Sequence, residues 1–279
     1  MKNLKFILPV LLCVGFYSCT ERIDLELNDQ ENERLVVEGW ITDQEKAHTV
    51  ELTLTSSYFE NQPAPRVMGA EVTISDGETT WTLSENEPGI YQTTPDVAGE
   101  AGKTYTLTID YEGQTYTATS FMRPVAPVDS MAFEYIDPFE EFGFEGDPYY
   151  EVKVWTQELA GLGDCYTWFL EVNGEQQRDT LSELSFVNDD LYDGNYVANT
   201  AIDILEIGEE ANAGDTVYLE QWNIGIKAYD IFNGILTETD WGGGLFDTPP
   251  ANVETNLSEG AIGYFGAASV SSRTAIIPE

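Results

Sequence analysis

A short acidic stretch of the chain has the side-chain types that calcium prefers as ligands. Asp189, Asp190, Asp193 and Asn195 surround Gly194, and Ca²⁺ in proteins takes carboxylate and amide oxygens. The spacing differs from that of a calcium-binding helix–loop–helix loop, and the bidentate glutamate of its last position is missing. The same residues are common in turns. We therefore interpret the stretch as a turn, with a weak calcium site as the alternative.

A histidine-based catalytic site would have to use His48, because the chain has 1 histidine. His48 lies at the start of a predicted strand, and we expect a surface or turn residue there. No second histidine is available to activate Cys165 as a nucleophile. Because Cys165 lies in an apolar stretch, we expect it to be a small buried core residue. The 50 acidic residues would permit carboxylate chemistry. With so many acids, however, pairs of them lie near one another by chance. We predict a protein that is not an enzyme.

Cys19 has the surroundings that indicate the most specific chemistry. Lys2 and Lys5 precede an apolar run that ends at Phe16, and Ser18 directly precedes the cysteine. A basic start and a short apolar run are typical of a secretory signal, and the run is shorter than the roughly 20 residues that span a membrane. The pattern resembles bacterial lipoprotein signals, which implies cleavage before Cys19 and attachment of acyl chains.

This processing would divide the N-terminal region into a signal peptide, residues 1–18, and a lipidated tether, residues 19–33. Several acyl chains anchor a protein stably, whereas one does so only marginally. We therefore expect a lipid-anchored protein of the outer membrane. Glu21 and Asp24 resemble the acidic residues that follow the cysteine of surface-displayed lipoproteins, although Arg22 does not fit, so display at the cell surface is the favoured orientation.

The net charge of −38 restricts the partners of this protein. It repels phosphate backbones, so nucleic acid is excluded as a partner. It also repels anionic headgroups, so contact with the membrane should come from the lipid anchor. The apolar fraction of 42% is ample for packed cores, and we interpret the acidity as a surface property that favours solubility.

The first part of the mature chain has the alternation of half-buried strands. Val50, Leu52 and Leu54 alternate with polar residues, and similar runs continue to Ser120 with no helical period. Dipeptides such as Glu112-Gly113 supply the turns between runs. This pattern predicts an immunoglobulin-like or transthyretin-like β-sandwich over residues 34–121.

A second β-rich domain is predicted over residues 131–279, after a proline-containing linker at 122–130. Its strand-like runs are Tyr149–Gln157, Cys165–Asn173, Ala201–Ile207, Thr216–Asn223 and Ala261–Ile277. One segment has a helical period instead, because its isoleucines and alanine recur at steps of three or four after the N-cap candidate Asn223. We predict one amphipathic helix over residues 224–238.

The segment after this helix is the predicted partner-contacting surface. Trp241 and Phe246 flank a leucine and three glycines, and Pro249 and Pro250 stiffen the chain that follows. Recognition residues often lie in loops held by a rigid β scaffold. The alternative is that this segment packs over the second domain as a structural element.

Several stretches of the chain resemble a known family. Arg34–Asp43, His48–Leu54 and Gly69–Gly77 resemble the opening of the DUF4249 family, and Leu245–Val253 and Gly260–Gly266 resemble its C-terminal signature. The resemblance covers nearly the whole mature chain. It implies a Bacteroidota envelope lipoprotein, often associated with TonB-dependent outer-membrane receptors, and it brings no established activity and no site residues.

These observations predict a non-enzymatic outer-membrane lipoprotein that acts as an accessory or binding partner of a TonB-dependent β-barrel receptor in nutrient uptake. One alternative is a structural or assembly subunit of a larger outer-membrane complex that handles no small ligand. Another is a carboxylate-based hydrolase that acts outside the cytoplasm. No cofactor is expected, apart from the Ca²⁺ of the alternative interpretation of the acidic stretch.

Overall fold

The computed structural model describes residues 33–56, 62–143, 145–239 and 253–279. The fold is mainly β, as the alternation predicts, and within these ranges it has several sheets and two α-helices. No helix in the described ranges is both long and apolar enough to cross a membrane. Cys19 and the predicted signal peptide lie outside these ranges.

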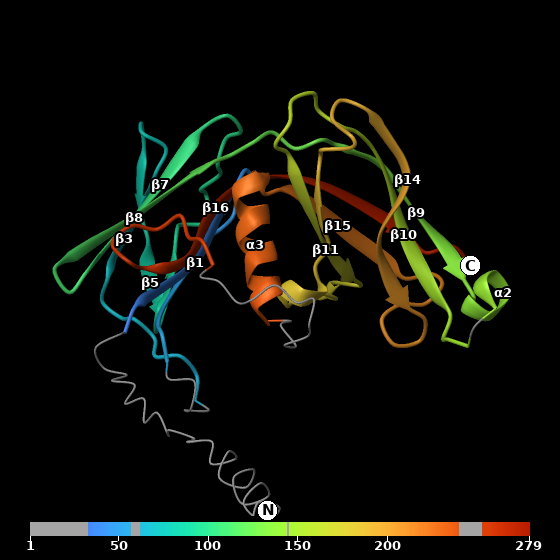
Figure 1. Cartoon of the computed structure of the whole chain (residues 1–279), viewed down its shortest axis with the longest axis horizontal. Helices are drawn as coiled ribbons and strands as arrows, with labels where there is room; N and C mark the ends of the chain where they lie inside the picture. Colours follow the sequence, from blue (N-terminus) through green and yellow to red (C-terminus); the bar gives the residue numbers. More distant parts are fainter. Residues whose placement is uncertain (1–32, 57–61, 144, 240–252) are drawn as a thin grey trace, which may run out of the picture. The chain divides into compact units, whose positions relative to one another are not determined.

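Two sheets enclose the first apolar core (Figure 1). One side of it is formed by β1 (Leu35–Thr42), β2 (Thr49–Leu54), β6 (Ile90–Gln92) and β5 (Ser84–Glu87). The other side is formed by β4 (Thr80–Thr82), β3 (Glu71–Ser75), β7 (Thr104–Tyr111) and β8 (Gln114–Phe121). In β7, alternate side chains such as Leu107 and Ile109 are fully buried. The predicted β-sandwich is confirmed.

A second pair of sheets encloses another core. A three-stranded sheet contains β9 (Val128–Ile136), β10 (Tyr149–Gln157) and β14 (Tyr196–Glu206). It packs against β11 (Cys165–Val172) and β15 (Thr216–Asn223), which are extended by β12 (Glu175–Gln176) and β13 (Phe186–Asn188). Val152, Leu170 and Leu219 are fully buried between them. The predicted bounds of β10 and β15 are the observed ones.

One strand, β16 (Ile262–Ile276), belongs to both halves of the chain. Its first half pairs in parallel with β1, and its second half pairs antiparallel with β15, as Figure 1 shows in red. The two predicted domains therefore share one nine-stranded sheet, and residues 34–279 form a single unit. The predicted linker, residues 122–130, begins directly after β8, which ends at Phe121, but its last three residues belong to β9, which starts at Val128.

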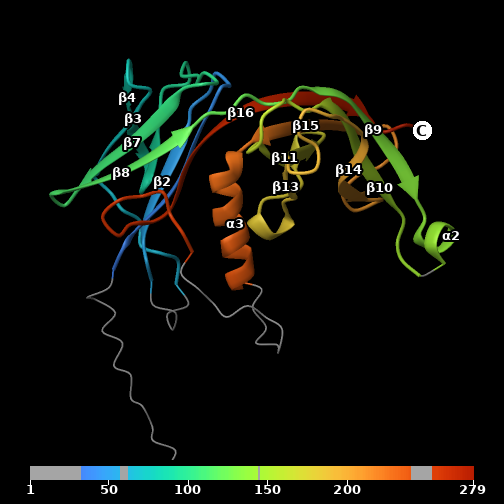
Figure 2. The ribbon, with the colours of Figure 1, turned by 45° about the horizontal axis from the view of Figure 1, so that its top comes forward.

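The predicted helix is confirmed as α3 (Gly225–Thr239), which contacts β11 and β16 (Figure 2). Its buried residues Ala228 and Ile231 belong to a third apolar cluster with Tyr264 of β16. A short second helix, α2 (Pro138–Phe142), was not expected from the sequence. The signals for it are present, because Asp137 accepts hydrogen bonds from the first turn and proline occupies the helix start.

Gly263 allows the parallel pairing at the centre of the nine-stranded sheet. Its φ is +97°, a conformation that residues with a Cβ atom rarely adopt. A Cβ atom at this position would also collide with the backbone carbonyl of Val37 on β1. Only glycine satisfies both constraints at this point of β16.

Replacement of Gly263 by alanine should destabilise the protein by at least about 2 kcal/mol more than Gly260→Ala, because it adds a backbone collision to the cost of a positive φ. Gly260 is the matched control, since its φ is +77° and a Cβ atom there meets nothing within 4 Å. Urea unfolding of both variants measures the difference. Equal losses of stability would show that the close approach to Val37 contributes nothing.

Candidate functional site

An aromatic cluster lies between the nine-stranded sheet and α3. Each ring comes from a different element, and the six residues are Trp40 (β1), Phe169 (β11), Phe186 (β13), Trp222 (β15), Phe232 (α3) and Tyr264 (β16). Strand alternation places them there. In β1, for example, Leu35, Val37 and Ile41 point into the first core, so Trp40 is directed to the opposite face of the sheet.

The rings of this aromatic cluster contact one another edge-on or tilted. The ring centre of Trp40 is 5.8 Å from that of Trp222, 6.0 Å from that of Phe232 and 5.4 Å from that of Tyr264. The interplanar angles lie between 47° and 75°. These are the arrangements that aromatic pairs prefer, so the rings hold one another in place.

Trp222 is also fixed by polar contacts. Its indole nitrogen donates a hydrogen bond of 2.8 Å to Glu220, which also accepts hydrogen bonds from Gln44 and Tyr218. Burial raises the pKa of Glu220, but the three hydrogen bonds outweigh it and hold the pKa below its usual range. The ammonium group of Lys46 lies 5.3 Å from the Trp222 ring centre, a cation–π contact.

The aromatic cluster lines a pocket of about 1000 Å³, at the upper end of the size of small-molecule sites. Aliphatic side chains such as Ile235 complete the apolar lining. The charged lining residues are Glu38, Asp179, Glu238, Glu254 and Arg34. Burial and the neighbouring Glu51 raise the pKa of Glu38. With four carboxyl groups and one guanidinium, this aromatic pocket suits a ligand that has flat apolar faces and no negative charge.

The two candidate nucleophile or base residues of the sequence are both structural. The surface position predicted for His48 is wrong, because the residue is only 2% exposed. Its Nδ1 accepts from the backbone of Thr42, and its Nε2 lies 3.1 Å from the carbonyl of Val97. Burial lowers its pKa, which favours the neutral ring that these contacts need. Cys165 is a fully buried core residue, as predicted, and burial raises the pKa of its thiol to about 12.

Asp190 and Asn195 make local contacts typical of a turn, whereas Asp193 contacts a residue 32 positions away. Asp190 is exposed and accepts from Asn188, Asp193 accepts from the backbone of Gly161, and Asn195 donates to the carbonyl of Asp193. Asp189 differs, because it is 2% exposed and its carboxylate accepts hydrogen bonds from the backbone nitrogens of Gly163 and Asp164.

Glu158 and Asp164 lie next to Asp189 in the structure and were not singled out in the sequence. Asp189 follows Asp164 by 25 residues, so no local spacing in the sequence indicates that the three acids converge.

The predicted partner-contacting residues Trp241, Phe246, Pro249 and Pro250 lie outside the described residues. The described residues that flank this segment include Glu238 and Val253, and both line the aromatic pocket. The lining within the described ranges has no histidine, cysteine or lysine. Stacking and apolar contact, together with contacts to the carboxyl groups and the guanidinium named above, are the interactions that this lining offers a ligand.

Comparison with protein families gives one match. A family described as a domain of unknown function, DUF4249, matches residues 20–274. This range includes all the elements described above apart from the end of β16. No curated protein matches the chain.

Replacement of Ile235 by tryptophan should fill the aromatic pocket and prevent it from binding a neutral apolar probe. Nile red fluorescence should rise on addition of the wild-type protein and stay low with the variant. The control is Ile226→Trp, which adds the same side chain to an exposed position of α3 that does not line the pocket. If both variants bind Nile red equally, the pocket is not the binding site.

Proposed function

The chain belongs to the DUF4249 family, and from this premise we propose that it is a non-enzymatic, lipid-anchored outer-membrane protein that binds a small ligand and assists a TonB-dependent receptor in nutrient uptake. The observation that carries the proposal is the aromatic pocket of about 1000 Å³. A subunit that only holds a complex together has no need of a preformed apolar pocket. The pocket therefore favours ligand binding over a purely structural role.

The lining supports a particular class of ligand. Aromatic rings offer flat faces for stacking on sugar or aromatic rings, and the rings of the aromatic cluster are held rigid by one another and by Glu220. A preformed site lowers the entropic cost of binding. The excess of carboxyl groups disfavours anions such as phosphorylated compounds, so a neutral glycan or a cationic aromatic compound is the proposed cargo.

The sequence around Cys19 supports the lipid anchor. Lipidation would keep the binding protein at the membrane without a spanning segment. The net charge of −38 keeps the body itself from adhering to anionic headgroups. A tethered binding protein raises the effective concentration of its cargo near a neighbouring receptor, which is the physical advantage of the proposed arrangement.

Cells that express the wild-type protein should incorporate labelled palmitate into it, and Cys19→Ala should abolish both the label and the recovery of the protein in the membrane fraction. Cys13→Ala is the control, since this cysteine lies within the predicted signal peptide and should leave lipidation intact. Undiminished labelling of the Cys19 variant would overturn the proposed anchor.

The partnership is tested by cross-linking in intact cells followed by purification of the tagged protein from solubilised outer membranes. A TonB-dependent β-barrel should be recovered with the wild type. Ile235→Trp should leave this recovery unchanged and reduce growth only on the nutrient that the receptor imports. Failure to recover any such barrel contradicts the proposal, and a growth defect on every carbon source would favour the assembly role.

A further inference from the structure

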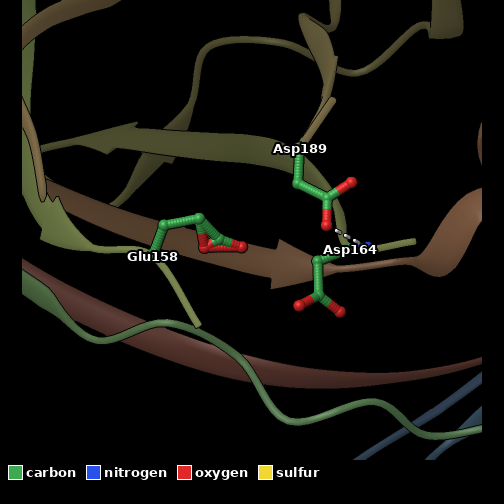
Figure 3. A group of neighbouring side chains, drawn as sticks. All are labelled: Glu158, Asp164 and Asp189. Carbon is green, nitrogen blue, oxygen red and sulfur yellow. Dashed lines mark hydrogen bonds between the residues drawn. The ribbon is translucent and has the colours of Figure 1, made fainter. Parts of the chain in front are cut away.

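A group of three buried acids lies outside the aromatic pocket. Glu158 directly follows β10, Asp164 directly precedes β11, and Asp189 directly follows β13. Their exposed fractions are 4%, 3% and 2%. One carboxylate oxygen from each lies within 4.8 Å of the other two, and Figure 3 shows the Glu158 side chain extending towards Asp164 and Asp189. We call this group the acidic triad.

Neighbouring donors hold each carboxylate of the acidic triad in place. The backbone nitrogens of Gly163 and Asp164 each donate a 3.1 Å hydrogen bond to Asp189. One oxygen of Asp164 accepts from Asn223 at 2.9 Å and forms an ion pair with Arg123. The hydroxyl of Tyr166 donates to Oε1 of Glu158 at 2.9 Å. Support of this kind orients metal ligands in established sites.

The second carboxylate oxygen of Glu158 is the independent indication of a ligand. Oε2 is buried and has no hydrogen-bond partner among the described residues. The carboxylate points from the end of β10 towards Asp164 and Asp189 (Figure 3). A buried carboxylate oxygen without a partner is costly, and a cation in this space would remove that cost.

The charge of the acidic triad matches a divalent ion. Three carboxylates face one another, and Arg123 is the cation in contact with them, through Asp164. With all three acids ionised, two negative charges are left without compensation. Burial and the charges of Asp164 and Asp189 raise the pKa of Glu158. A bound proton and a bound cation are therefore alternative ways of neutralising this carboxylate.

We propose that Glu158, Asp164 and Asp189 form a calcium site. Ca²⁺ accepts irregular arrangements of oxygen ligands, whereas Mg²⁺ requires near-ideal octahedral geometry, so three carboxylates with oxygens within 4.8 Å of one another suit Ca²⁺ better. Glu158 and Tyr166 also line a cavity of about 410 Å³. This cavity provides an access path and room for the water molecules that complete the coordination of Ca²⁺.

The calcium site shares only Asp189 with the acidic stretch seen in the sequence. It joins the end of β10, the start of β11 and the turn after β13, so a bound ion would hold the edge of the second sandwich together. The site is separate from the aromatic pocket and does not depend on the proposed function.

The test uses full-length protein in detergent, freed of metal with EGTA and titrated with Ca²⁺. The melting temperature of the wild type should rise by about 5 °C or more at 100 times the dissociation constant, and less with Mg²⁺.

Glu158→Gln should lose this response, and its metal-free melting temperature should equal or exceed that of the wild type, because a buried uncompensated charge has been removed. Asp190→Asn is the control, because this exposed neighbour is outside the acidic triad and should respond as the wild type does. No response of the wild type overturns the proposal. An equal response of Glu158→Gln also overturns it, since surface acids would then account for the binding.

Luminescence of Tb³⁺, a calcium substitute that nearby aromatic rings sensitise, gives a second readout through Tyr166. The wild type should show a signal that Ca²⁺ displaces, and Glu158→Gln should bind Tb³⁺ about tenfold more weakly or worse. An unchanged signal in the variant would place the ion elsewhere and contradict the assignment.

Discussion

The change of pairing partner along β16 is the constraint on which the rest of the structure depends. Its first half pairs in parallel with β1 and its second half antiparallel with β15. The strand and the residues at its ends contribute to all three apolar clusters, through Phe265 to the first, Ile277 to the second and Tyr264 to the third. Without this strand, β1 and β15 would each be an unpaired edge of its sheet.

The register of this pairing also determines the aromatic pocket. Gly266 lies opposite Trp40 across the parallel ladder, and a Cβ atom there would collide with the Trp40 ring. Glu38 lies opposite Tyr264 across the same ladder. Because Trp40 is two residues after Glu38 on β1, its side chain points to the same face of the sheet as that of Tyr264. The side chains that would bind a ligand are thus placed by backbone pairing that also closes the cores, which makes the site rigid at little additional cost.

Local pattern predicted the elements far better than the contacts between them. Alternation identified β10 and β15 with their bounds, and the period of the isoleucines identified α3. The parallel pairing of β1 with β16 could not be predicted from the sequence, because it joins residues near opposite ends of the chain. The position of His48 at the start of a strand predicts a surface or turn residue, yet its ring contacts the backbone of Thr42 and of Val97 and is buried. Convergence of distant residues leaves no period in a sequence.

The parallel ladder between β1 and β16 has a consequence for how the chain folds. The side chain of Arg34 reaches the carbonyl of Gly260 across 226 residues, so the ladder closes a loop that includes almost every other element. Closing so long a loop costs much chain entropy before any contact repays it, which makes folding slow. Until then β1 has an unpaired edge, which other chains can pair with.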